Sequence, residues 1–157
     1  MNIKIRDYKK EDKSQVQDIF KKYWTDPEFL YELSGELDNF TDLKKHFSGF
    51  IVAEENNKIV GIAGYKETPN YLKDFAKTDS TVELYVIAVK DKRKGVGKIL
   101  KSNIIVKAKE NNFSEILLFS PESHKESWSF HDTHDFERLG EVIPPEDEVG
   151  QVWSKLL

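Results

Sequence analysis

The sequence contains no cysteine. Without a thiol the chain can form no disulfide, no zinc–thiolate site and no cysteine nucleophile. It also lacks an apolar run long enough to span a bilayer, and its first residues, MNIKIRDYKKEDK, lack the apolar core of a secretory signal. These absences suit a reducing compartment. We therefore expect a soluble, cytoplasmic protein without a membrane partner.

Basic residues are slightly fewer than acidic ones, with 24 Lys and Arg against 28 Asp and Glu. A net charge of −4 is untypical of a nucleic-acid-binding domain. The basic stretch at residues 90–109 contains no aromatic side chain on which bases could stack. We therefore expect no nucleic-acid partner. The 157 residues, 38% of them hydrophobic, predict one globular domain spanning residues 1–157.

Hydrophobic periodicity predicts both helices and strands. Apolar residues at helical spacing predict helices before residue 24, after Pro27, and from Gly97 onward. Strands are expected at residues 2–7, at 49–67 as a hairpin turning at ENNK, and at 80–89, 113–120, 136–142 and 150–157. Residues 122–135 are expected to form a helix. This order predicts one mixed α/β domain of the α+β kind.

The stretch VKDKRKGVGKIL, residues 89–100, combines five basic residues with two glycines after an apolar strand. It is no P-loop, because Ile99 follows Gly97-Lys98 where Ser or Thr is required. It is no dinucleotide fingerprint, because Leu100 stands at the third glycine. A basic turn leading into a helix N-terminus favours anion binding. A solvated basic turn, with glycines serving backbone geometry alone, remains the alternative.

The longer stretch ELYVIAVKDKRKGVGKIL resembles the acetyl-CoA-binding core of the GNAT acetyltransferases, where Gln/Arg-x-x-Gly-x-Gly/Ala follows a central strand. The motif falls on Lys92, Gly95 and Gly97, with Lys in place of Gln or Arg. The order of elements matches along nearly the whole chain. The resemblance implies the GNAT acyl-CoA N-acyltransferase fold, with a central mixed, mostly antiparallel sheet that is flanked by helices and splayed at its central strands.

The resemblance also implies an acetyl-CoA-dependent N-acetyltransferase that acetylates a primary amine of a small molecule or peptide by direct attack. Acetyl-CoA would be the co-substrate, and no metal is implied. The pantetheine arm is assigned to the backbone of Ile87, Ala88 and Val89. The residues assigned to the pyrophosphate are Lys92, Arg93, Lys94, Gly95, Val96, Gly97 and Lys98.

Glu83 is the candidate general base. It is the lone charged residue in the apolar strand 80–89, and burial raises the pKa of a carboxyl group toward the range useful for a base. It also falls where some GNAT members place their base. A glutamate at a sheet edge, or one paired with a lysine, is the alternative.

The family pattern Asn-x-x-Ala-x-x-Phe-Tyr, whose tyrosine protonates the leaving thiolate, corresponds here to HKESWSFH. His124, Ser127 and Phe130 take the first positions and would contact the cofactor, and His131 replaces the tyrosine. An imidazolium can donate a proton to a thiolate, so His131 is the candidate acid. A histidine that only packs against the cofactor is the alternative. A metal site with His134 lacks an evident third distant ligand.

The exchange of tyrosine for histidine also motivates a second hypothesis, a non-catalytic coenzyme A-binding or regulatory GNAT-like domain. Aromatic residues and acids in the first two helices, in residues 67–80 and in the 140–150 loop suit a cationic amine acceptor. The C-terminal strand is compatible with a monomer or a homodimer.

Overall fold

The computed structural model describes residues 2–39, 48–92 and 94–157. The chain divides into two compact units, one of Met1–Lys66 and Val86–Ile104 and the other of Glu67–Tyr85 and Ile105–Leu157. We call them unit 1 and unit 2. Strand β4 (Thr81–Val89) and helix α4 (Val96–Glu110) each begin in one unit and end in the other.

The strands in the described part of the chain run in the order β1-β2-β3-β4-β5-β7-β6. Neighbours pair antiparallel from β1 to β3 and from β5 through β7 to β6, whereas β4 and β5 are parallel. The sheet is therefore mixed and mostly antiparallel, and the predicted fold class is confirmed. Thr81–Glu83 of β4 pair with Glu115–Leu117 of β5.

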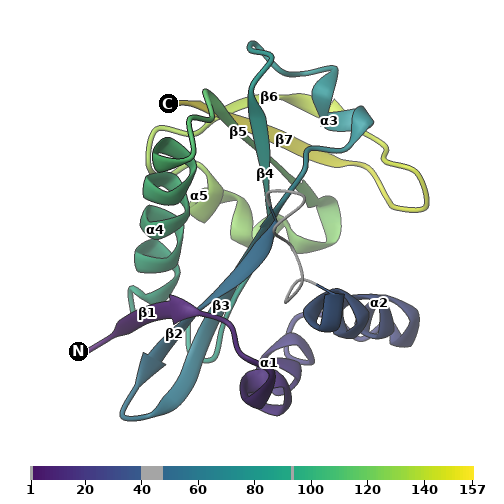
Figure 1. Ribbon diagram of the computed structural model, residues 1–157. Coiled ribbons are helices and arrows are strands. Elements are labelled where there is room, and N and C mark those ends of the chain that lie inside the picture. Colours follow the sequence, from purple (N-terminus) through teal and green to yellow (C-terminus); the bar gives the residue numbers. More distant parts are fainter. Residues whose placement is uncertain (1, 40–47, 93) are drawn as a thin grey trace. The chain divides into compact units, whose positions relative to one another are not determined.

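Unit 1 contains an antiparallel sheet and the first two α-helices (Figure 1). Its elements are β1 (Lys4–Asp7), η1 (Lys10–Asp12), α1 (Lys13–Phe20), α2 (Pro27–Asn39), β2 (Gly49–Glu55) and β3 (Lys58–Lys66). The predicted break before Pro27 is confirmed. The predicted turn of the β2–β3 hairpin is also confirmed, because Asn56 and Asn57 adopt positive φ angles of 51° and 63°.

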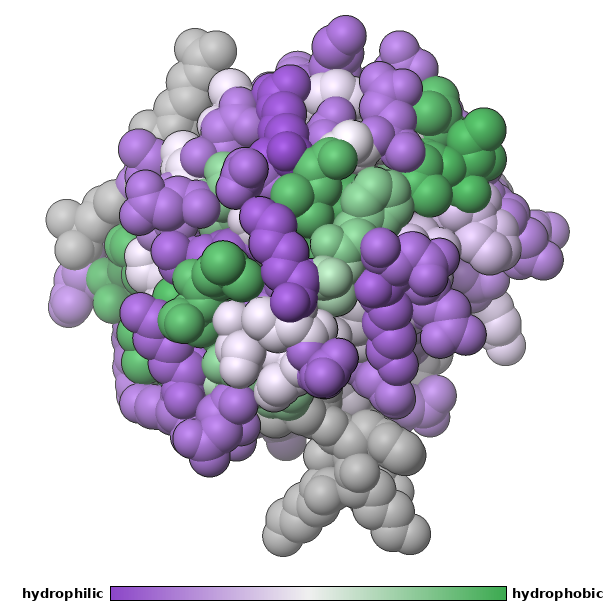
Figure 2. All heavy atoms as spheres, turned by 90° about the horizontal axis from the view of Figure 1, so that it is seen from above, coloured by the Kyte–Doolittle hydropathy of each residue, from purple (hydrophilic) through white to green (hydrophobic). Residues whose placement is uncertain are grey.

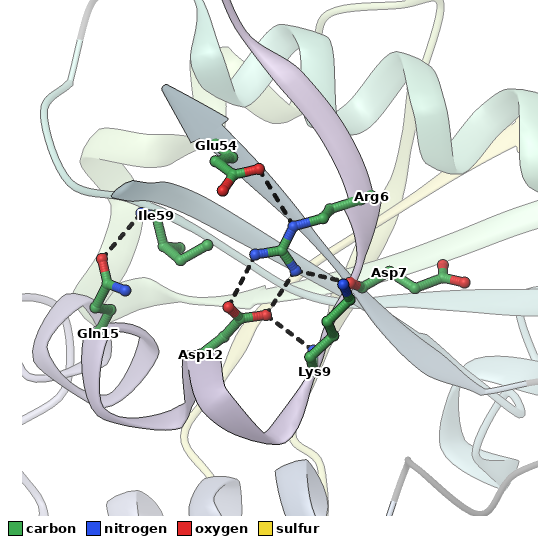
Figure 3. Close-up of polar contacts among 7 residues, drawn as sticks. All are labelled: Arg6, Asp7, Lys9, Asp12, Gln15, Glu54 and Ile59. Carbon is green, nitrogen blue, oxygen red and sulfur yellow. Dashed lines mark hydrogen bonds and ion pairs between the residues drawn. The ribbon is translucent and has the colours of Figure 1, made fainter. Parts of the chain in front are cut away.

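A partly buried ion-pair network connects β1 with β2 and with the start of α1 (Figure 3). Arg6 on β1 donates two hydrogen bonds to the carboxylate of Asp12, at 2.8 and 2.9 Å, and one to Glu54 on β2 at 3.3 Å. The backbone amide of Lys9 donates a further bond to Asp12. The network fixes the entry into α1, whose apolar face (Val16, Ile19 and Phe20) is buried as predicted.

Unit 2 contains the remaining elements, which are α3 (Asn70–Lys73), β5 (Glu115–Pro121), η3 (Glu122–Ser127), α5 (Trp128–His131), β6 (Glu137–Val142) and β7 (Gly150–Leu156). Leu72, Leu117 and Val152 form its buried cluster. Glu115, fully buried on β5, accepts hydrogen bonds from the amides of Lys77 and Thr78. The polar connection before β4 is thereby attached to β5.

Some element boundaries differ from the sequence prediction. Helix α1 ends at Phe20, although the helical spacing of apolar residues continues to Trp24. Helix α4 begins at Val96, one residue before the expected Gly97. The single helix expected at 122–135 is a 3₁₀ segment followed by the short α5, because His124 leaves helical geometry and α5 ends at His131. His134 and Asp135 then adopt positive φ angles of 62° and 63°, which no helix continues.

The face drawn in Figure 2 is mainly hydrophilic, with apolar residues in separate patches. Exposed large apolar side chains include Tyr31, Val106, Ile143 and Leu156. Scattered apolar residues of this kind are normal on a folded domain. Among the described residues, no helix is both long and apolar enough to span a bilayer.

Candidate functional site

In unit 1, the candidate site is the turn between β4 and α4. Gly95 adopts a positive φ of 79°, a conformation that disfavours any residue with a Cβ. The first hydrogen bond of α4 runs from the Ile99 amide to the Gly95 carbonyl. The amides of Val96, Gly97 and Lys98 therefore precede the first intrahelical bond, and these are the groups that bind anions at a helix N-terminus.

The basic side chains around this turn are exposed to solvent. Lys92, Lys94 and Lys98 are all exposed, and Lys94 lies 3.9 Å from Asp91 in an exposed ion pair. Such a pair is weak, so it leaves Lys94 able to attract an anion. Arg93 lies outside the described residues. The turn thus combines exposed cations with helix-terminal amides, which fits a phosphate ligand.

The end of β4 is held by side chains that the sequence did not predict for the cofactor turn. The hydroxyl of Tyr23 donates a hydrogen bond of 2.7 Å to the carbonyl oxygen of Val89. The amide of Lys90 donates to Val60, and the ammonium group of Lys22 donates to the Lys90 carbonyl. The Val89 carbonyl thus already has one partner, and a pantetheine amide would have to use its second lone pair or a neighbouring group.

Gly61 on β3 permits α4 to approach the sheet. A Cβ at this position would lie 2.9 Å from side-chain carbons of both Leu100 and Val96, and 3.4 Å from the carbonyl oxygen of Ala88. The first turn of α4 therefore packs directly on the backbone of Gly61. Only the spatial arrangement reveals this role, because the sequence of β3 does not show which element packs on it.

In unit 2, Glu83 is buried on β4, with 4% of its surface exposed. It stands opposite Leu117 in the parallel register, and adjacent residues of paired strands point to the same face. Leu117 packs in the cluster that Tyr71 of α3 covers. The negative charge of Glu83, with that of Asp147, adds to burial in raising the pKa of the Tyr71 phenol well above its usual value. Glu83 therefore lies close to a phenol and below the surface.

His131 is the last residue of α5 and is 8% exposed. Its ring centroid lies 5.0 Å from that of Trp153 on β7 and 5.7 Å from that of Phe130. Phe130, Ser127 and His124 are half-buried. His124 and Ser127 precede α5 in the 3₁₀ segment, whose turn differs from the α-helical spacing expected for this pattern.

His131 and His134 do not lie on one face of a helix, because α5 ends at His131. The Nδ1 atom of His134 lies 3.0 Å from the hydroxyl oxygen of Thr133, its neighbour in the chain. Within the ranges 2–39, 48–92 and 94–157, no three His, Cys, Asp or Glu side chains gather in a geometry that could hold a metal ion.

Comparison with solved structures shows the same fold over the whole chain. An N-acetyltransferase from Staphylococcus aureus is 19% identical, with a TM-score of 0.76 and 99% of each chain covered. A ribosomal-protein-alanine N-acetyltransferase from Brucella melitensis is 19% identical, with a TM-score of 0.73 over 98% of this chain and 99% of that one. The PaiA N-acetyltransferase from Thermoplasma acidophilum, solved with coenzyme A, is 16% identical over both full chains, with a TM-score of 0.68.

None of the curated proteins compared matches the sequence significantly. The model of the acetyltransferase (GNAT) family, in contrast, matches residues 14–136, which is more than half of the chain. This match includes β4, the basic turn and the N-terminal turn of α4. The chain belongs to the GNAT family of acetyltransferases.

Proposed function

We propose that this protein is an acetyl-CoA-dependent N-acetyltransferase that acetylates a primary amine of a small molecule or peptide. The observation that carries the proposal is the turn from β4 to α4, where the left-handed Gly95 precedes the amides of a helix N-terminus and exposed lysines surround it. The GNAT family match supports it. So does the Thermoplasma acidophilum relative, whose structure contains coenzyme A.

The turn has the groups needed to hold coenzyme A. The amides from Lys94 to Lys98 would bind the pyrophosphate, with Lys92 and Arg93 beside it. The backbone of Ile87–Val89 would bind the pantetheine amides, and His124, Ser127 and Phe130 would contact the rest of the cofactor. We propose that residues 1–157 act as one transferase domain, supported by relatives that align over 98–100% of this chain.

The chemistry needs one base and one acid. Acetyl-CoA would supply the acetyl group as a thioester. Glu83 would accept the proton that the acceptor amine loses as its nitrogen attacks the thioester carbonyl. His131 would donate a proton to the sulfur as the carbon–sulfur bond breaks. The new amide and free coenzyme A would be the products, and both side chains would return to their starting protonation states through solvent.

The first experiment is calorimetric titration with acetyl-CoA and with dephospho-CoA. The Gly95→Glu variant places a carboxylate at the turn in a strained conformation, and we expect it to lose binding. Gly35→Glu is the matched control, because a Cβ at Gly35 meets nothing within 4 Å. Absence of binding to the folded wild type would overturn the assignment of the turn to coenzyme A.

The second experiment measures thiol release with a panel of primary amines. Because the protein has no cysteine, a thiol reagent detects only coenzyme A. We expect His131→Ala to lower turnover far more than acetyl-CoA affinity. His131→Tyr, which restores the family's usual acid, should retain turnover. Tight acetyl-CoA binding without transfer to any amine would favour the non-catalytic alternative.

A further inference from the structure

The carboxylate of Asp132, which directly follows His131, is held by donors from two strands. Arg138 on β6 donates from Nε to Oδ1 at 2.8 Å and from its terminal nitrogen to Oδ2 at 3.0 Å. Trp153 on β7 donates from its indole nitrogen to Oδ1 at 2.9 Å. These three bonds occupy both oxygens and fix the carboxylate in one orientation.

Both donors also belong to an aromatic cluster that contacts the ring of His131. The Arg138 guanidinium lies 5.6 Å from the ring centroid of Trp128 and 5.7 Å from that of Trp153. The two indoles pack edge to face at 5.7 Å, and Trp153 also contacts the imidazole. Trp153 therefore touches His131 with its ring and Asp132 with its nitrogen.

Stability alone does not account for this arrangement. The side chains of Asp132 and Arg138 are 44% and 46% exposed, and ion pairs between exposed groups add little to folding stability. The two-pronged pair instead fixes the orientation of the Asp132 carboxylate, because a guanidinium holds a carboxylate in its own plane. The helix end that it orients is the one that carries His131.

The charges near His131 act in opposite directions. Hydrogen bonds from Arg138 and Trp153 lower the pKa of Asp132, and the charge of His131 lowers it further. Asp132 and the imidazolium thus attract each other, whereas the Arg138 guanidinium, bound to the same carboxylate, offsets part of that attraction. Lys125 is a more distant cation, with its ammonium group 5.6 Å from the centroid of the Trp128 ring.

We propose that Asp132, held by Arg138 and Trp153, is the positioning residue for His131. The carboxylate fixes the end of α5 against β6 and β7 and keeps an anion beside the imidazolium, while Arg138 offsets part of that charge. This inference rests on the proposed function, in which His131 donates a proton to the leaving thiolate. The GNAT pattern, with tyrosine at this position, has no need of such a charge.

The test is a histidine titration by nuclear magnetic resonance in the wild type and two variants. Asp132→Asn removes the anion next to His131 and leaves the Arg138 guanidinium uncompensated, so the midpoint of His131 should fall by about half a pH unit. Arg138→Met leaves the carboxylate alone, so the midpoint should rise by about the same amount. Asp135→Asn is the matched control, because Asn tolerates its positive φ, and the midpoint should stay unchanged.

Opposite shifts support the positioning role. Shifts in the same direction, or none, overturn it, because loosened packing would move both variants toward the midpoint of a solvated histidine. The same variants should move the acidic group in the pH profile of turnover by matching amounts. Unchanged turnover in His131→Ala would remove the acid role from the proposed function, and the titrations would still decide whether Asp132 positions the ring.

Discussion

The hydroxyl of Tyr23 and the carbonyl oxygen of Val89 are joined by a hydrogen bond of 2.7 Å. Tyr23 lies just beyond α1, whereas Val89 is the last residue of β4. The ammonium group of Lys92 lies over the ring of Tyr23, 5.2 Å from its centroid. One side chain therefore connects the end of a helix, the end of a strand and the basic turn.

Tyr23→Phe keeps the ring and removes this bond. We expect the free energy of unfolding to fall by about 1 kcal/mol, as for a typical buried hydrogen bond, and the affinity for acetyl-CoA to fall several-fold because the strand end is released. Denaturant unfolding and calorimetry measure the two effects. Tyr31→Phe, at a largely exposed tyrosine, is the control and should change neither. Unchanged affinity in Tyr23→Phe would separate this bond from cofactor binding.

Gly61→Ala should move the first turn of α4. The new Cβ would lie 2.9 Å from carbons of both Leu100 and Val96, closer than packed carbons tolerate. We expect a loss of about 1–3 kcal/mol in the free energy of unfolding, the usual cost of overpacking, together with weaker acetyl-CoA binding. Thermal unfolding and calorimetric titration measure both.

Gly35→Ala is the matched control for Gly61→Ala. Gly35 lies within α2, and its Cβ would meet nothing within 4 Å. The same substitution there should raise stability by about 0.5–1 kcal/mol, since alanine favours the helix, and should leave cofactor binding unchanged. Equal effects of the two substitutions would show that close packing on Gly61 is unimportant.

Asp12 should give unit 1 a pH-dependent stability. Burial by itself raises the pKa of Asp12, but hydrogen bonds from Arg6 and the Lys9 amide, with the charge of Arg6, hold it below the ordinary value of 3.8. A carboxyl whose pKa is lower in the folded state stabilises the fold above its unfolded pKa. That contribution disappears as the pH falls through the folded pKa.

Asp12→Asn should therefore lower the free energy of unfolding by about 2 kcal/mol at neutral pH, as expected for hydrogen bonds to a charged group. The difference from the wild type should shrink as the pH falls below about 4, because Asp12 is then protonated in the unfolded wild-type chain. Denaturant unfolding between neutral pH and pH 3 measures it. A difference that is constant across this range would contradict the ionic role.

Glu115 should be more sensitive to truncation than to loss of its charge. One of its oxygens accepts from the amides of Lys77 and Thr78, and the other accepts from the hydroxyl of Ser154. Gln can keep the first oxygen and donate to the Ser154 hydroxyl, whereas Ala leaves buried donors unsatisfied. We expect Glu115→Ala to cost about 3 kcal/mol and Glu115→Gln less than half of that. Chemical denaturation of both variants measures it, and equal losses would contradict the argument.

Local sequence patterns predicted an element correctly where the pattern is compatible with only one kind of secondary structure. Two consecutive asparagines between β-branched runs gave the hairpin turn, and Pro27 marked the start of α2. The helix expected at 122–135 was wrong in extent, because its few apolar residues lack a sustained helical period; His124 leaves helical geometry and α5 already ends at His131. Lys101 is fully buried within α4, although a lysine at its position suggests a solvated face.

By itself, the sequence determined the order of elements, the mixed α/β class and the basic Gly-x-Gly turn, because these depend on residues close together in the chain. Only the tertiary structure decided that Tyr23 bonds to Val89 and that α4 packs on Gly61. It also decided that Arg138 and Trp153 bind Asp132, the residue after His131. These partners are separated along the chain and follow no period. Their pairing depends on the register of strands and the packing of helices, which a single sequence does not display.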